Sequence, residues 1–265
     1  MPDEQMAGDV ARAALIPDEA VRLEAVARQK NVTLRIAGSV GVYLGCPAWR
    51  GYLPAMGRRV LHDIDYWAKS KEQKKLEDLF ASEGYQADPK IKHMHEWGVK
   101  RLIFDHPETG IKIDVFMDEL VMAHTIKFRD RLDTIGGPAV SVIDLLLSKL
   151  QIHEITANDL MDLVVLLGEH DISSAEAASS DLAYLEGVLG ADWGFWFEAC
   201  SNLDGVREAV EQYETLGPAE RAVVHSRAGD LRTRIEACKK TSAWKRRSWI
   251  GTKTRWYELV SEVDR

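Results

Sequence analysis

The pattern of hydrophobic and polar residues divides the chain into two parts. Up to about Asp118, short apolar and β-branched runs alternate with one or two amphipathic stretches, whereas beyond about Ser141 apolar residues recur at helical spacing. Residues 136–138, Gly-Gly-Pro, lie between the two parts, and such residues interrupt regular structure. We therefore predict an α+β domain over residues 1–135 and a helical domain over residues 136–265.

The first part is predicted to alternate strands with helices. Apolar spacing predicts an amphipathic helix over Pro17–Lys30 and a shorter one over Val40–Leu44, with a loop over residues 45–59. Ser70 can cap a further helix that stops at Gly84, because Ser accepts hydrogen bonds from free N–H groups and Gly adopts the left-handed conformation that ends helices. The predicted strands are Thr33–Ala37, Val60–Trp67, Ile91–Trp97, Lys100–Asp105 and Ile111–Phe116.

The second part is predicted to consist of successive helices. Ser141 and Asn158 stand where they can cap the first two of them. The predicted helices are Ser141–His153, Asn158–Glu169, Ser174–Gly187, Trp193–Tyr213, Pro218–Lys239 and Thr254–Val263. No segment repeats at a fixed period, so we expect a helical domain that is not built from repeats.

The segment Asp63-Ile64-Asp65 is the sharpest candidate for chemistry. On a strand, residues i and i+2 project to the same face, so the two carboxylates point together. Two such charges repel each other unless a cation lies between them, and Mg²⁺ binds through one or two carboxylates, substrate phosphates and water. A pair of this kind also occurs by chance at a solvated strand edge. The pattern alone leaves both interpretations open.

Two further features favour the metal site. Asp114 lies among apolar residues of a predicted strand, and a buried carboxylate needs a cation or strong hydrogen-bond donors. Gly38 and Ser39 lie at a predicted strand-to-helix turn. There, glycine lets the backbone approach a phosphate, and the first N–H groups of the helix are available to bind it.

Three segments in this order resemble the polymerase-β-like nucleotidyltransferase superfamily. They are Ala-Gly-Ser-Val-Gly-Val-Tyr at 37–43, His-Asp-Ile-Asp-Tyr at 62–66 and Ile-Lys-Ile-Asp-Val-Phe at 111–116. More narrowly, the chain resembles the bacterial AbiEii-type group, which includes toxin–antitoxin and abortive-infection proteins, over roughly residues 30–170. The resemblance implies an α+β nucleotidyltransferase fold, in which a mixed sheet with flanking helices is followed by a helical domain.

Charged residues outside these segments also match the AbiEii-type group. The group typically carries an arginine shortly before the D-x-D, matched here by Arg58 or Arg59. It carries a lysine in the first helix after the catalytic domain, matched by Lys149, and an acidic pair in the next helix, matched by Asp159 and Asp162. These matches come in the order that the group shows.

The resemblance implies metal-dependent transfer of a nucleotide from an NTP to an acceptor hydroxyl. Asp63, Asp65 and Asp114 would be the catalytic residues and would bind Mg²⁺ or Mn²⁺. The residues implied to hold the triphosphate are Gly38, Ser39, Arg59 and Lys149. The acceptor would be tRNA, a protein or a small molecule, and a toxin-type enzyme would have an antitoxin or other protein partner. The alternative is a non-catalytic protein that keeps the fold and binds nucleotide or RNA; Lys149 can equally be a lysine that snorkels from an amphipathic helix.

The stretch Lys239–Arg255 is basic, although the chain has a formal net charge of −8. It contains no acidic residue, and Trp244, Trp249 and the adjoining Trp256 are interleaved with its cations, a pattern suited to phosphates and to stacking on bases. The candidate nucleic-acid-binding residues are Lys245, Arg246, Arg247, Lys253 and Arg255. An exposed helix whose tryptophans pack inward, or a contact for an acidic partner, would give the same pattern.

Composition narrows the class of protein further. With 46% hydrophobic and 29% charged residues, the chain is typical of a globular protein, and its net charge argues against non-specific coating of nucleic acid. Cys46, Cys200 and Cys238 are too widely spaced for a zinc site, so we expect reduced thiols. The N-terminus lacks the features of a signal peptide, and no apolar run approaches the ~20 residues that span a bilayer. We therefore expect a cytoplasmic protein with no membrane partner.

Overall fold

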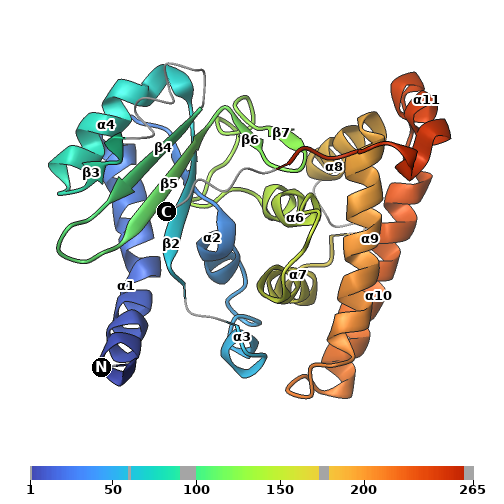
Figure 1. Cartoon of the computed structure of the whole chain (residues 1–265), viewed down its shortest axis with the longest axis horizontal. Helices are drawn as coiled ribbons and strands as arrows, with labels where there is room; N and C mark the ends of the chain where they lie inside the picture. Colours follow the sequence, from blue (N-terminus) through green and yellow to red (C-terminus); the bar gives the residue numbers. More distant parts are fainter. Residues whose placement is uncertain (1, 59–60, 90–99, 173–178, 260–265) are drawn as a thin grey trace. The chain divides into compact units, whose positions relative to one another are not determined.

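The computed structural model describes residues 2–58, 61–89, 100–172 and 179–259, and it divides into two compact units (Figure 1). The first unit comprises residues 1–45, 59–120 and 127–141, and the second comprises residues 46–58, 121–126 and 142–265. The first unit combines a sheet with helices and the second is helical, which confirms the predicted α+β class. The predicted domain boundary between residues 135 and 136 stays a prediction. The first compact unit ends at residue 141, and the short segments 46–58 and 121–126, which precede that residue in the sequence, belong to the second unit.

A five-stranded mixed sheet forms the centre of the first unit. Its strands are β1 (Leu34–Ile36), β2 (Asp63–Ala68), β3 (Gln86–Ala87), β4 (Arg101–Asp105) and β5 (Lys112–Met117). The order across the sheet is β1-β2-β5-β4-β3, in which β2 and β5 are parallel and the other neighbours are antiparallel. The four predicted strands that fall on described residues are confirmed, whereas the predicted strand Ile91–Trp97 lies outside them. The strand β3 was not predicted, because two residues are too few to show an alternating pattern.

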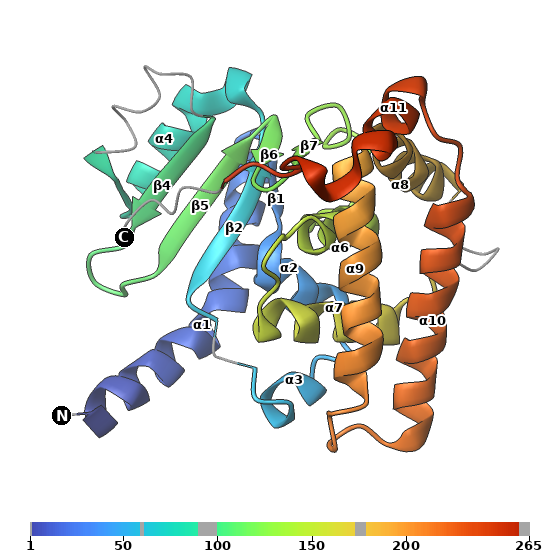
Figure 2. The ribbon, with the colours of Figure 1, turned by 45° about the vertical axis from the view of Figure 1, so that its right-hand side comes forward.

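One face of this sheet is covered by helices α1 (Pro2–Gln29) and α4 (Gln73–Ser82) (Figure 2). The hydroxyl of Tyr66 on β2 donates to the carbonyl oxygen of Ala20 on α1 at 2.8 Å. The rings of Phe80 on α4 and Phe104 on β4 lie with their centroids 4.5 Å apart. Since side chains alternate along a strand, residues 63, 65 and 114 project to the opposite face.

The predicted start of the first helix at Pro17 is wrong, because α1 begins at Pro2 and continues through this proline. Proline removes one hydrogen bond from a helix interior and normally interrupts it. Here Ile16 and Ala20, on either side of Pro17, are fully buried against the sheet. Burial of the apolar face therefore offsets the local preference of the sequence.

Ser70 does not cap α4 as predicted. It begins a short 3₁₀ helix, Ser70–Glu72, and its backbone N–H and hydroxyl both donate to the Asp118 carboxylate. Asp118 has a φ of +65° and connects β5 to a two-stranded sheet of β6 (Glu119–Val121) and β7 (Thr125–Lys127). The predicted stop at Gly84 fits the structure, since α4 ends at Ser82 and Gly84 has a φ of +89°.

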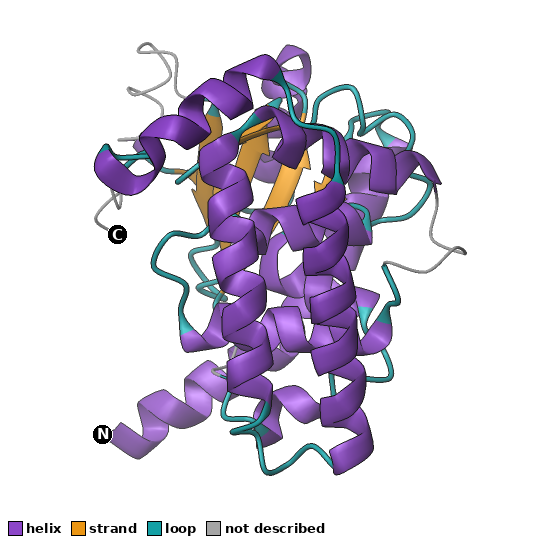
Figure 3. Ribbon diagram, turned by 90° about the vertical axis from the view of Figure 1, so that its right-hand side faces the viewer, coloured by secondary structure: helices purple, strands orange, loops and turns teal. Residues whose placement is uncertain are grey.

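Helices make up most of the second unit, and α9 and α10 lie side by side in it (Figure 3). The helices are α3 (Tyr52–Ala55), α6 (Val142–Leu150), α7 (Ala157–Glu169), α8 (Ser179–Ala191), α9 (Trp193–Val210), α10 (Pro218–Ala237) and α11 (Ser242–Ile250). The N-cap of α7 is Thr156, whose hydroxyl accepts from the Asp159 N–H, and not Asn158 as predicted. The short helix α3 occupies part of the predicted loop over residues 45–59.

The position predicted for the last helix of the chain is wrong. A helix was predicted over Thr254–Val263, but residues 254–259 are not helical, and the remainder lies outside the described residues. The helix α11 lies upstream, where Thr241 caps its start and Gly251, with a φ of +57°, ends it. Beyond it, the Trp256 indole donates to Glu198 at 2.6 Å. This tertiary contact fixes the extended tail, and helical periodicity could not reveal it.

The three cysteines are free and buried in the structure. Burial raises the pKa of Cys46 to about 12 and also raises the pKa of Cys200 to about 12. These two thiols therefore stay protonated and poorly nucleophilic near neutral pH. Among the helices that the structure describes, none has the length and apolar character needed to cross a membrane.

Candidate active site

The predicted carboxylates meet on one face of two neighbouring strands. In the parallel pair β2–β5, Asp65 is in register with Asp114, and Asp63 is in register with Lys112. Residues in register on adjacent strands project to the same face, and Asp63 lies two positions from Asp65 on that face. Asp63 and Asp65 are partly exposed, whereas Asp114 is 2% exposed. Residues 49 positions apart in the chain are thus brought side by side.

The Gly38 turn lies directly against this face. The N–H of Ala37 donates to the backbone oxygen of Asp65 at 2.8 Å, which holds the end of β1 beside β2. Helix α2 (Gly38–Gly45) then begins at Gly38, whose φ is +57°, and Ser39 is its second residue. A Cβ atom on Gly38 would lie 1.9 Å from Oδ2 of Asp65. Only glycine leaves room for the Asp65 carboxylate at the start of α2.

We predict that Gly38→Ala destabilises the first unit. The left-handed φ disfavours alanine, and its methyl group would displace the Asp65 carboxylate. The expected loss in the free energy of unfolding is at least about 2 kcal/mol, measured by urea denaturation. Gly136→Ala is the matched control, because a Cβ atom there meets nothing within 4 Å. Equal stability of the two variants would contradict the close contact between Gly38 and Asp65.

Arg101 is a member of this cluster that the sequence did not predict. From β4, its guanidinium donates to both oxygens of Asp114, with Nε–Oδ1 at 3.2 Å and Nη2–Oδ2 at 2.9 Å. It also lies over the ring of Phe116, 5.1 Å from the centroid. The sequence places Arg101 in the predicted strand Lys100–Asp105, but only the order of strands across the sheet shows that it lies beside Asp114. Arg101 supplies the positive partner that the buried carboxylate was expected to need.

The carboxylate oxygens of this cluster are ligands of the type that a hard divalent cation prefers, although the side chains are not positioned around a common ion site. In the described part of the chain, no group of three or more His, Cys, Asp or Glu side chains is positioned to hold a metal ion. Asp63, Asp65 and Asp114 nevertheless offer carboxylate oxygens, the ligands that Mg²⁺ and Mn²⁺ prefer. Both oxygens of Asp114 are engaged by Arg101. The residues therefore fit the ion by donor type, and Arg101 competes with the ion for the carboxylate of Asp114.

The charged residues matched to the AbiEii-type group gather in one ionic network within the second unit. Lys149 on α6 places Nζ 2.7 Å from Asp159 Oδ1 and 2.8 Å from Asp162 Oδ2, both on α7. Arg58 Nε lies 3.0 Å from Asp162 Oδ1. Burial lowers the pKa of Lys149, but the two carboxylates raise it more, so the net pKa lies above its ordinary value. The ammonium group is buried and does not snorkel to solvent, whereas Arg59 lies outside the described residues.

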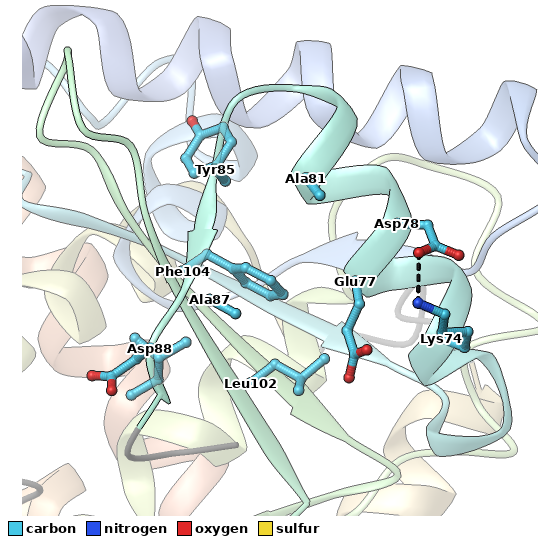
Figure 4. Close-up of a pocket in the computed structure, with 10 residues that line it drawn as sticks. Lys74, Glu77, Asp78, Ala81, Tyr85, Ala87, Asp88, Leu102 and Phe104 are labelled. Carbon is cyan, nitrogen blue, oxygen red and sulfur yellow. Dashed lines mark hydrogen bonds and ion pairs between the residues drawn. The ribbon is translucent and has the colours of Figure 1, made fainter. Parts of the chain in front are cut away.

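A cavity of about 200 Å³ lies elsewhere on the first unit (Figure 4). Its floor includes Leu102 and Phe104, which project toward the face covered by α1 and α4. Two of its charged lining residues, Lys74 and Asp78, are paired with each other at 2.8 Å. The cavity is therefore separate from the carboxylates of Asp65 and Asp114, which project from the opposite face.

Comparison with known proteins adds little to this geometry. No protein-family model matches the chain, and no curated protein sequence matches it. Among solved structures, the chain is similar to the antibiotic-resistance factor ANT(2'')-Ia, determined in solution, at 11% sequence identity. The similarity covers 86% of this chain and 95% of that chain with a TM-score of 0.33. A similarity this loose leaves the function to be inferred from the residues of the site.

Proposed function

We propose that the protein is a metal-dependent nucleotidyltransferase, which moves a nucleoside monophosphate from an NTP to an acceptor hydroxyl. The observation that carries this proposal is the pairing of Asp65 with Asp114 on parallel strands, with the Gly38 turn packed against Asp65. A carboxylate cluster beside a glycine at a helix start combines ligands for a divalent ion with N–H donors for phosphate. The resemblance of the three sequence segments to the polymerase-β-like superfamily supports the same activity.

In the proposed reaction, Asp63 and Asp65 would hold Mg²⁺ or Mn²⁺, with Asp114 beside them. When bound, the ion neutralises the charge that develops on the phosphate oxygens. The backbone N–H groups at Gly38 and Ser39 donate to the triphosphate, and Asp114 accepts the proton of the acceptor hydroxyl. A bond forms between the acceptor oxygen and the α-phosphorus, while the bond from the α-phosphorus to the bridging oxygen breaks and pyrophosphate leaves.

Several finer features rest only on the AbiEii-type resemblance. The triphosphate contacts of Arg59 and Lys149, the role as a toxin and the antitoxin partner remain predictions of that resemblance. The ammonium group of Lys149 is engaged by Asp159 and Asp162, so a role for it in nucleotide binding would include release from these carboxylates. The acceptor remains open among tRNA, protein and small molecules.

The proposal is tested by a transfer assay. The protein is incubated with Mg²⁺ and each NTP labelled at the α-phosphate, together with total tRNA or with no added acceptor. We expect transfer of label that requires Mg²⁺ and that is abolished by Asp63→Ala. Mg²⁺-dependent nucleotide binding without transfer would favour a non-catalytic nucleotide-binding protein of the same fold. The absence of both transfer and Mg²⁺-dependent binding would contradict either function.

The ion pair of Arg101 with Asp114 leads to a prediction about metal affinity. Because Arg101 is a cation paired with both Asp114 oxygens, Arg101→Gln should remove this competitor and strengthen Mn²⁺ binding about tenfold in the absence of NTP. Free Mn²⁺ is measured by electron paramagnetic resonance. Lys100→Gln is the matched control, since it removes a neighbouring charge that is 45% exposed and pairs with Glu119. An equal affinity in both variants, or a gain that persists when Asp114→Asn is added, would contradict competition between Arg101 and the ion for Asp114.

A further inference from the structure

The outer face of α11 exposes a tryptophan among cations. Trp249 is 83% exposed and Ile250 is 44% exposed, and no residue of α11 is buried. Lys245 and Arg246 precede Trp249 by four and three residues, so they flank it on the same side of the helix. Lys253 follows in the 3₁₀ turn Gly251–Lys253 and is also exposed. We refer to Lys245, Arg246, Trp249 and Lys253 as the α11 outer face.

The other side of α11 holds the helix in place. The rings of Trp244 and Trp196 on α9 lie with their centroids 5.1 Å apart. The guanidinium of Arg247 lies 5.0 Å from the ring centroid of Trp193 and donates to the carbonyl oxygens of Gly251 and Thr254. Arg247 therefore acts as a structural residue, and it is left out of the α11 outer face. With Trp244 and Arg247 anchoring the helix, Trp249 is presented to solvent on a fixed support.

The charged residues of the segment that carries Trp249 are all of one sign. No acidic residue occurs between Lys239 and Tyr257, although the whole chain has a formal net charge of −8. Within the described residues, no hydrogen bond or ion pair engages the side chains of Lys245, Arg246 or Lys253. An exposed indole flanked by unengaged cations can stack on a base while the cations contact neighbouring phosphates. The surface is thus complementary to an anion that carries flat aromatic groups.

We propose that the α11 outer face binds single-stranded nucleic acid. Unpaired bases offer an open π-face to Trp249, whereas the bases of a duplex are already stacked on one another. An acidic protein would match the charge, but a typical protein interface buries a larger apolar area than Trp249 and Ile250 provide. Because the rest of the chain is negatively charged and repels phosphates, we expect the nucleic acid to contact only the α11 outer face. The proposal goes beyond nucleotidyl transfer, since it needs neither NTP nor metal.

The test is fluorescence anisotropy with a labelled oligouridylate of about 12 nucleotides, a length within the range of single-strand site sizes. Loss of stacking should make Trp249→Leu bind about tenfold more weakly, whereas Trp249→Phe, which keeps an aromatic ring, should lose much less. Lys245→Gln with Arg246→Gln should weaken binding and reduce the salt slope by about 1.4, that is about 0.7 per phosphate contact. Lys74→Gln with Lys75→Gln, exposed residues of α4, removes the same charge and should change nothing.

Three outcomes would overturn the proposal. They are unchanged binding by Trp249→Leu, equal binding of a duplex of the same length, and equal competition by polyglutamate, which would indicate an acidic protein as partner. Circular dichroism of each variant confirms that the helices are intact. Because the binding measurement contains no NTP or Mg²⁺, a negative result there would not bear on the proposed transfer reaction. A failed transfer assay would likewise not bear on nucleic-acid binding by the α11 outer face.

Discussion

Asp65→Asn is expected to reduce Mg²⁺-dependent nucleotidyl transfer by about a thousandfold, the scale of losing a group that stabilises developing charge. Asparagine keeps the size and shape of the side chain that packs against Gly38, but it lacks the negative charge that would hold a divalent ion. The free energy of unfolding should change little in comparison. The rate is measured under single-turnover conditions with α-labelled NTP, and stability is measured by urea denaturation.

Asp130→Asn is the control for this substitution. The Asp130 side chain is 90% exposed and pairs with the neighbouring Arg129, so the same chemical change should leave transfer unaffected. Retention of a tenth or more of the rate in Asp65→Asn would rule out Asp65 as an essential metal ligand. A thousandfold loss accompanied by unfolding would point to a structural role at Gly38 and leave the metal unsupported.

Asp162→Asn is expected to lower the free energy of unfolding by about 3–5 kcal/mol, as when one partner of a buried ion pair is removed. The Asp162 side chain is 1% exposed and accepts from Arg58 while pairing with Lys149. Together with Asp159, the network contains two cations and two carboxylates. Removing the charge of Asp162 leaves both cations with a single carboxylate in a buried setting. Urea denaturation followed by circular dichroism gives the magnitude.

Asp78→Asn provides the comparison for a solvent-exposed pair. Asp78 and Lys74 lie 2.8 Å apart with side chains 64% and 79% exposed, so solvent screens the pair and Asp78→Asn should lose far less stability than Asp162→Asn. If the two variants lost equal stability, the network around Asp162 would not hold α6, α7 and Arg58 together.

The same network predicts a dependence of stability on pH. Burial raises the pKa of Asp159, but Lys149 lowers it more, so the net pKa lies below the ordinary value of 3.8. A carboxyl group with a lowered pKa stabilises the folded state above its unfolded pKa, and this contribution is lost as pH falls through the folded pKa. The unfolding free energy should therefore decline below about pH 4. Asp159→Asn should make that decline shallower, and an unchanged slope would exclude this carboxyl group as its source.

Some helix boundaries could be predicted from local signals alone. The starts of α9 at Trp193 and α10 at Pro218 agree with the prediction, because capping residues and proline act on adjacent backbone groups. The end of α4 just before Gly84 is another boundary that a local signal predicted correctly. The boundaries of α1 and α11 were missed, since they depend on contacts with distant residues: Ile16 and Ala20 are buried in the sheet core, and Trp256 is bonded to Glu198.

The sequence by itself determined that Asp63 and Asp65 share one face of a strand, because alternation is a property of the extended backbone. It also determined that a buried Asp114 would need a positive or hydrogen-bonding partner. Only the tertiary structure decided that Asp114 stands in register with Asp65, that Gly38 packs against this carboxylate, and that the partner is Arg101. The physical reason is that strand order and register are set by packing the whole sheet against α1 and α4, and no local pattern encodes which distant strands become neighbours.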